Sequence, residues 1–226
     1  MKTSNIILYS TAGLIFLAMI SLSFRMRSNL KNQNVDMITQ TYEISGFEQI
    51  EADGKLRLQI QKGSEFKIEF KSSEKDFKKK LELNMNGNLL QISLNKDYKP
   101  QERIKGTITL PTITSLDIDG ETKVTLEGFP INQLHLKTLG KSHINLKDNQ
   151  IDSLFAICKE KGSIDYRSGQ ARFAHLEFNN RTRSYFSGGV IGIVEGKLQD
   201  SAYVNFKTKT EKMNLELWDK ATISRR

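Results

Sequence analysis

The sequence predicts an all-β protein. It is expected to be a single-stranded parallel β-helix, a solenoid of about 20 residues per coil, preceded by an antiparallel hairpin region and one N-terminal transmembrane helix. From about Ile113 onward, a motif in which a small residue is followed two positions later by an apolar one occurs six times. Around each motif, apolar and polar residues alternate as in strands that bury one face. Residues 6–24 contain no charged side chain.

The apolar residue that ends each motif sets the register of the predicted coils. These six anchors advance by 20, 20, 22, 18 and 19 residues and are Val124, Ile144, Ile164, Phe186, Val204 and Ile223. The residues eight and ten positions before the anchors are mainly apolar, which indicates one continuous core. The residue two positions before each anchor is always small, which predicts a tight corner. We therefore expect two short strands per coil, stacked into parallel sheets.

The region before the repeats is predicted to be antiparallel. Residues 56–60 and 66–70 alternate between apolar and polar, and Gly63-Ser64 between them suits a hairpin turn. A second hairpin is predicted at Asn86-Gly87, which separates two further strands. Ser72–Lys80 is expected to form a short helix with Ser73 as its N-cap. A strand at residues 107–111 then leads into the repeats.

The N-terminal segment Ile6–Phe24 is long enough to cross the hydrocarbon core of a bilayer. We expect an uncleaved anchor in the lipid of the inner membrane, with a cleaved signal peptide as the alternative. Residues 1–5 form a short tail, residues 25–41 a polar linker, and residues 42–226 the β-helical domain. Slightly more positive charges follow the segment than precede it, which alone favours a cytoplasmic domain.

The net charge of +8 does not indicate a nucleic-acid-binding protein. Four of the excess basic residues lie in residues 1–31, and the remaining 30 basic residues are nearly balanced by 26 acidic ones. The sequence contains no nucleic-acid-binding motif. Cys158 is the only cysteine, so an intrachain disulfide and a paired-cysteine zinc site are excluded. It falls in an inward column and is expected to be an inert, buried thiol.

The outward-facing columns are where a binding or catalytic site would lie. The candidate patch consists of Phe155, Ile157, Glu177, Glu195 and Lys197. In the predicted register Glu177 and Glu195 are neighbours on adjacent coils, about 4.8 Å apart, where one carboxylate could raise the pKa of the other. A solvated face on which Lys197 balances the charge is the favoured interpretation. The three histidines occupy different columns, so no metal site, catalytic group or cofactor is expected.

Several motifs resemble the GIN-domain family, known as an auto-transporter adhesin head domain of Bacteroidetes-type bacteria. They are Phe47–Ile50 with Gly54, the hairpin at residues 86–89, Ile108–Pro111, and the repeats themselves. The resemblance covers about residues 42–226 and implies an extracytoplasmic β-helical module with an adhesin role. Glycine leads only the first two motifs, at Gly120 and Gly140. It is replaced later by Glu160, Thr182, Asp200 and Asp219, which leaves the geometry of those corners open.

The functional hypothesis is a membrane-anchored, non-catalytic binding or structural module at the cell envelope, with an envelope glycan or protein as its partner. The alternatives are a polysaccharide lyase or hydrolase of the β-helix type, and an envelope-associated sensor. The terminal coil of a solenoid exposes an unpaired edge. We therefore also expect a homodimer formed through the C-terminal coil.

Overall fold

The computed structural model describes residues 37–225. The predicted tail, membrane anchor Ile6–Phe24 and most of the predicted linker lie outside the described residues. Within residues 37–225, no helix is both long enough and apolar enough to span a bilayer. The compact unit that begins at Ile38 is described below by itself.

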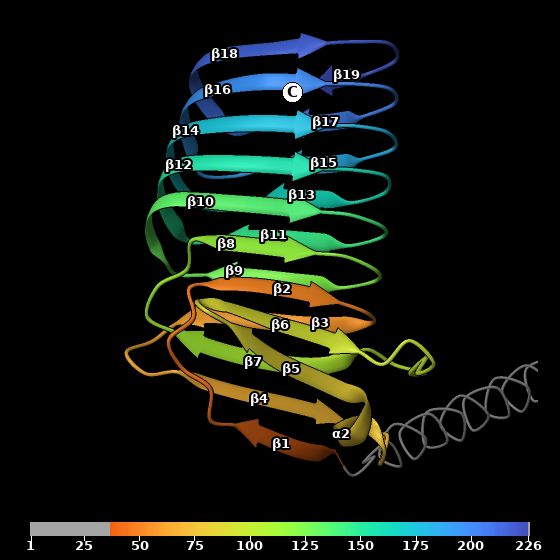
Figure 1. The fold of residues 1–226 in the computed structure, drawn as a ribbon. Helices are drawn as coiled ribbons and strands as arrows, with labels where there is room; N and C mark the ends of the chain where they lie inside the picture. Colours follow the sequence, from red (N-terminus) through yellow and green to blue (C-terminus); the bar gives the residue numbers. More distant parts are fainter. Residues whose placement is uncertain (1–36, 226) are drawn as a thin grey trace, which may run out of the picture. The chain divides into compact units, whose positions relative to one another are not determined.

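The six repeats form a parallel β-helix, as predicted (Figure 1). Each coil contributes one strand to each of two sheets, and each strand pairs in parallel with the corresponding strand of the next coil. In sheet A these strands are β9 (Lys123–Glu127), β11 (His143–Lys147), β13 (Ser163–Tyr166), β15 (Arg183–Phe186), β17 (Tyr203–Phe206) and β19 (Thr222–Ser224). In sheet B they are β8 (Ser115–Ile118), β10 (Pro130–Thr138), β12 (Asn149–Cys158), β14 (Gly169–Phe178), β16 (Val190–Leu198) and β18 (Lys209–Leu217).

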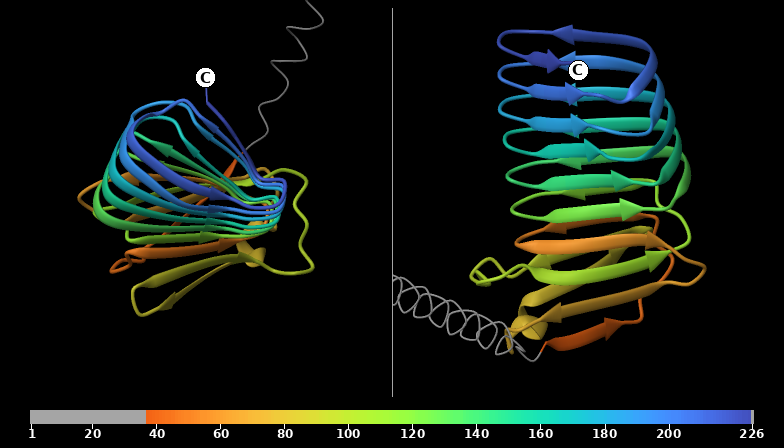
Figure 2. Two further views of the ribbon diagram at one scale, coloured as in Figure 1. Left: turned by 90° about the horizontal axis from the view of Figure 1, so that it is seen from above. Right: turned by 180° about the vertical axis from the view of Figure 1, so that it is seen from behind.

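The N-terminal strands extend the same two sheets and do not form a separate layer (Figure 2). β2 (Gln49–Asp53) pairs in parallel with β8, and β3 (Leu56–Lys62) pairs in parallel with β9, so these two strands act as a preceding coil. Sheet A continues through β7 (Ile104–Leu110), β4 (Lys67–Ser72) and β1 (Ile38–Tyr42). Sheet B continues through β6 (Leu89–Leu94) and β5 (Leu81–Asn86).

One of the two predicted hairpins is confirmed and the other is wrong. β5 and β6 pair antiparallel, and Gly87 has the positive φ of 63° that a tight hairpin turn requires. β3 and β4 do not pair with each other, because β7 lies between them, parallel to β3 and antiparallel to β4. The alternating pattern identified both strands correctly, but alternation carries no information about which strand is the neighbour.

The predicted helix at Ser72–Lys80 is shorter than expected. Only the single turn α2 (Phe77–Lys80) is helical, and Phe77 anchors it in the core. Ser73 is not the N-cap. Asp76 takes that position without a side-chain hydrogen bond, while the hydroxyl of Ser72 accepts a hydrogen bond from the backbone N–H of Glu74.

The register of the fourth coil differs from the prediction. Ser184, and not Phe186, lies opposite the anchor Val204, whereas Phe186 lies opposite Tyr166 and Phe206. The anchors therefore advance by 20 residues from coil to coil until the last step, which is 19. The fourth anchor is therefore Ser184, although an apolar anchor was expected. Ser184 can be fully buried because its hydroxyl accepts a hydrogen bond from the N–H of Ile164 at 3.0 Å.

All six corners adopt the same left-handed backbone conformation, including the four corners that have no glycine. In the corrected register the corner residues have φ between 57° and 68° and are Gly120, Gly140, Glu160, Asn180, Asp200 and Asp219. Asn and Asp tolerate this conformation better than most residues. Thr182, which was predicted to lead the fourth corner, lies two positions after the actual corner residue Asn180 and is buried.

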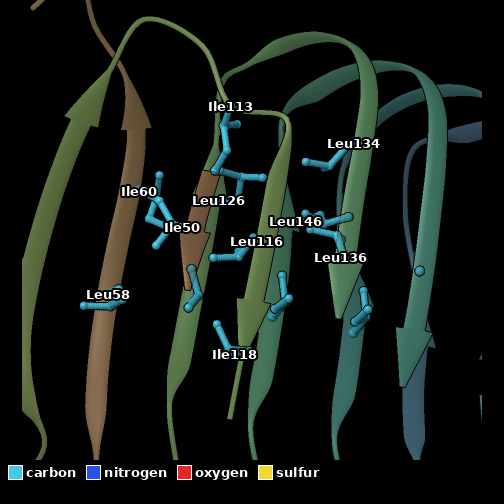
Figure 3. Packing of buried hydrophobic residues seen from close by; sticks show 14 of the residues in the cluster. Ile50, Leu58, Ile60, Ile113, Leu116, Ile118, Leu126, Leu134, Leu136 and Leu146 are labelled. Carbon is cyan, nitrogen blue, oxygen red and sulfur yellow. The ribbon is translucent and has the colours of Figure 1, made fainter. Parts of the chain in front are cut away.

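The inward columns fill the space between the two sheets with apolar side chains (Figure 3). Three aromatic residues, Tyr166, Phe186 and Phe206, stack on successive coils with ring centroids 6.2 and 4.9 Å apart. Cys158 is fully buried, as predicted, and burial raises the pKa of its thiol to about 12. This thiol is therefore protonated and inert at neutral pH.

Candidate functional site

The outer face of sheet B carries a cluster of aromatic and aliphatic side chains, which we call the aromatic face. It consists of alternate, outward-pointing residues from β10, β12, β14 and β16: His135, Phe155, Ile157, Phe173, His175 and Ile193. The ring of His135 stacks on Phe155, with centroids 4.9 Å apart and planes 11° apart. On its other side lie Phe173 and His175, whose ring centroids are 6.1 and 6.4 Å from the centroid of Phe155. The sheet thus positions an aromatic stack that crosses three coils.

The register correction changes the predicted carboxylate pair. Glu177 lies opposite Lys197, and Glu195 lies opposite His175. The imidazole of His175 is placed between the two acids, with Nδ1 3.4 Å from an oxygen of Glu195 and Nε2 3.3 Å from an oxygen of Glu177. Neighbouring carboxylates were predicted here, and that geometry is wrong.

The other candidate residues are all on this face. Phe155 and Ile157 lie in its centre, each partly covered by neighbouring side chains. Lys197 was expected to balance the acids, but its ammonium group lies over the ring of Trp218, 4.2 Å from the centroid. This is a cation–π contact with a side chain that is half exposed. The five predicted residues therefore do share one surface, with the apolar groups on β12 and the charges beside them on β14 and β16.

A groove adjoins the aromatic face along its edge. The strands of sheet B bend there, because two consecutive residues point outward between buried residues in four successive coils. The groove has a volume of about 620 Å³. Its lining includes the ion pair of Arg172 with Asp152, at 3.1 Å. Ile193 belongs both to the groove and to the aromatic face, and its side chain is 40% exposed.

A second cluster, on the outer face of sheet A, was not predicted. His143 Nδ1 lies 2.6 Å from the hydroxyl of Ser163, and Nε2 lies 3.7 Å from a carboxylate oxygen of Asp165. Burial lowers the pKa of His143 and raises the pKa of Asp165. The 20-residue spacing of His143 and Ser163 was the available signal, since it places them opposite each other on adjacent coils.

The geometry of this second cluster does not favour nucleophilic catalysis. Asp165 is nearly buried and accepts a hydrogen bond from the backbone N–H of Tyr185 at 3.1 Å. The backbone N–H of Ser163 itself donates to Ser142, as expected inside a parallel sheet. Acyl transfer needs N–H groups aimed at a developing oxyanion, and the N–H groups of Ser163 and Tyr185 are already engaged. The cluster is a local polar network in which Ser163 and Asp165 are the polar partners of the half-buried imidazole of His143.

Comparison with known proteins agrees with the fold. Residues 46–187 match the family described as "Putative auto-transporter adhesin, head GIN domain". A solved structure of a putative adhesin from Bacteroides fragilis is similar with a TM-score of 0.65 and 18% identity, over 84% of this chain and 97% of that one. No curated protein matches the chain.

Two further solved structures come from Parabacteroides distasonis. One is titled a putative adhesin, with a TM-score of 0.55, 10% identity and coverage of 84% and 97%. The other is titled a putative lipid binding protein, with a TM-score of 0.53, 15% identity and coverage of 85% and 98%. At these identities the likeness concerns the fold alone. Because the family match spans more than half of its residues, this chain belongs to the head GIN domain family.

Proposed function

We propose that this protein is a non-catalytic binding module of the cell envelope that engages a partner protein through the aromatic face of sheet B. The observation that carries the proposal is the composition of that face. Its centre is aromatic and aliphatic, and charged groups border the centre on both sides, Glu177, Glu195 and Lys197 on β14 and β16 and Lys137 on β10. Protein interfaces have the same anatomy, with an aromatic-rich core and a polar rim.

An envelope glycan is the other partner class to be tested, and an enzyme acting on polysaccharides has less support. Hydrolases and lyases need several polar groups converging on one bond of the substrate. Here the middle of the face is occupied by Phe155 and Phe173, and the two acids are separated by His175. The adhesin names within the family also favour binding over catalysis. A periplasmic or otherwise extracytoplasmic location, and anchoring through Ile6–Phe24, are part of the proposal.

Site-specific photo-crosslinking tests the proposed face in living cells. A photoreactive amino acid replaces Ile193 in the full-length protein, and a matched control carries it at Met85, which is 38% exposed on β5. We expect a discrete, protease-sensitive adduct from position 193 and none from position 85. The partner in that adduct is then identified by mass spectrometry.

The substitution Ile193→Glu provides a second readout, because it places a charge in the apolar centre. It should lower binding of the identified partner by about tenfold or more, while Met85→Glu leaves binding unchanged. Adducts that form equally at both positions, or that contain only glycan, would contradict a protein partner. A reporter fused after Arg226, active on only one side of the membrane, tests the location separately.

A further inference from the structure

The topology of sheet A brings basic side chains together from distant parts of the sequence. Strands β4, β7, β3, β9 and β11 are consecutive in this sheet, although they are not consecutive in the chain. Their register places Lys71 opposite Lys105, Lys105 opposite Arg57, and Arg57 opposite Lys123. We call these four residues the basic row. His143 continues the row on β11.

The side chains of the basic row all point to solvent. Each lies in its strand next to a buried residue, as in Leu56-Arg57-Leu58, and all four are exposed. Residues opposite one another in neighbouring strands project from the same face of the sheet, about 4.8 Å apart. The row therefore crosses the strands as a line of four positive charges.

This arrangement is electrostatically unfavourable in the isolated protein. Like charges directly opposite each other destabilise a sheet. Lys71 has a partner in Glu69, at 2.7 Å. For Arg57, Lys105 and Lys123, residues 37–225 provide no carboxylate within 4.0 Å. A line of uncompensated charges on a rigid sheet is the complement of a line of negative charges.

On β7, β3 and β9 the column beside the basic row is neutral and polar, and on β4 it continues as Glu69, the partner of Lys71. It contains Thr107, Gln59 and Thr125, which lie opposite one another on β7, β3 and β9. The amide of Gln59 donates a hydrogen bond to Glu127 at 2.9 Å, and the two threonine hydroxyls are available as donors and acceptors. This column suits a ligand that carries hydroxyl groups as well as acidic groups.

The width of the row discriminates between anionic partners. A bilayer surface is bound by broad basic patches or by amphipathic helices, whereas this row is one residue wide and four strands long. Single-stranded nucleic acids use aromatic platforms for stacking, but on β4, β7, β3 and β9 the basic row and the column beside it contain no aromatic residue. A linear acidic polymer fits both the single line of charge and the polar column.

We propose that the basic row binds a linear acidic polysaccharide, which crosses the strands of sheet A with its carboxylate or sulfate groups over Lys105, Arg57 and Lys123. The ligand lies on the opposite sheet from the aromatic face, so this site does not depend on the proposed protein-binding function. Binding through exposed charges is screened by salt, and the affinity falls as the ionic strength rises.

Direct binding of polygalacturonate to the full-length protein in detergent micelles tests the proposal. The triple variant with Arg57→Gln, Lys105→Gln and Lys123→Gln should bind about tenfold or more weakly. A charge-matched control replaces Lys78, Lys79 and Lys80, the only basic run of the sequence, with glutamine. The control should bind like the wild type. Because the triple variant relieves repulsion, its melting temperature should be unchanged or higher, which separates lost binding from misfolding.

Three results would overturn the proposal. One is equal loss of binding in the control, which would indicate a general effect of net charge. Another is equally strong binding of neutral dextran. The third is binding to phosphatidylglycerol vesicles without binding to polygalacturonate, which would identify a membrane surface. The variant Ile193→Glu should leave polygalacturonate binding intact, so failure of either proposed site can be recognised separately.

Discussion

At the scale of single residues, a buried amide holds one corner of the solenoid. Asn149 is fully buried, its Nδ2 donates to the carbonyl of Leu126 at 2.9 Å, and its Oδ1 accepts from the N–H of Phe129 at 3.0 Å. In the next coil Gly169 lies opposite Asn149. One side chain therefore accepts from the backbone N–H of Phe129 and adds a donor to the carbonyl of Leu126 inside the protein.

We predict that Asn149→Ala lowers the free energy of unfolding by about 2–3 kcal/mol, because the backbone N–H of Phe129 loses its acceptor and the carbonyl of Leu126 loses a donor. Urea denaturation followed by circular dichroism measures this change. The control Asn214→Ala, at an exposed position of β18, should stay within about 0.5 kcal/mol of the wild type. A loss of the same small size for Asn149→Ala would mean that water can replace the amide.

His143 makes a prediction about pH. Burial lowers the pKa of this histidine in the folded protein; the charge of Asp165 opposes this shift, and Lys123 and Arg167 add to it. The unfolded chain, with an ordinary histidine pKa of about 6.5, then binds the proton at a higher pH than the folded chain does. The contribution of neutral His143 to the free energy of unfolding is therefore fully present above the unfolded-state pKa and is lost as the pH falls below it. The raised pKa of Asp165 opposes this trend at lower pH, where its protonation favours the folded state.

The measurement is the melting temperature between pH 7.5 and pH 5.5. We expect it to fall over this interval in the wild type and to fall less in His143→Gln. The control is His135→Gln, which removes a histidine that is exposed on sheet B. Identical slopes in all three proteins would show that His143 is not the titrating group.

At the scale of elements, the strands were predictable and their neighbours were only partly so. Period and alternation identify the coils, because most inward residues are apolar, and buried polar groups in proteins mostly have a hydrogen-bond partner. Ser184 is polar, and its hydrogen bond with the N–H of Ile164 cannot be recognised from the sequence.

The order of the strands was less predictable than their positions. β7 lies between β3 and β4 because of contacts between segments about 40 residues apart, and alternation does not encode such contacts. The basic row depends on this placement and could not be predicted either. The aromatic face was partly predictable, because His135 lies opposite Phe155 in the predicted register as well, whereas His175 joins this column only in the corrected register.

The corners of the coils give the prediction at this scale. Glu160 has a φ of 59°, a conformation that costs about 1–2 kcal/mol in an L-residue. Glycine avoids this cost but loses about 0.5–1 kcal/mol of chain entropy on folding. We therefore expect Glu160→Gly to stabilise the protein by about 0.5–1 kcal/mol. The N–H of Glu160, which donates to Asn180 at 3.2 Å, is retained in this variant.

The converse variant is Gly140→Ala. Gly140 has a φ of 67°, and an added Cβ would lie 2.8 Å from Oδ1 of Asp119. This change should destabilise the protein by about 1–2 kcal/mol or more. Both free energies are obtained from urea denaturation. A destabilising effect of Glu160→Gly would show that the side chain of Glu160 contributes more than its backbone costs.

At the scale of the whole molecule, the β-helix separates two kinds of surface. The two sheets lie on the two sides of one core (Figure 2). The outer face of sheet A carries the basic row and the polar column beside it, and the outer face of sheet B carries the aromatic face. A solenoid has this property because every coil repeats the same inward and outward positions. The two proposed partners would therefore be held on opposite sides of the protein without competing for one site.

The last coil leaves core-type side chains uncovered. Leu217 continues the inward column of Cys158, Phe178 and Leu198, yet 49% of it is exposed. Met213, Leu215 and Ile223 lie in the same coil and are only partly buried. Within residues 37–225, no strand pairs with the outer edges of β18 and β19. Apolar surface next to open strand edges favours association, which supports the predicted homodimer.

We predict that the full-length protein in detergent has about twice the chain mass of 25.8 kDa by light scattering corrected for bound detergent. The double variant Leu217→Arg with Ile223→Arg places charges on the exposed end of the core and should be monomeric. Met85→Arg, on the distant strand β5, should remain dimeric and controls for the added charge. A monomeric wild type would refute the dimer. A dimer that persists in the double variant would place the contact elsewhere, because two buried, unpaired arginines cost more than such an end-to-end contact can supply.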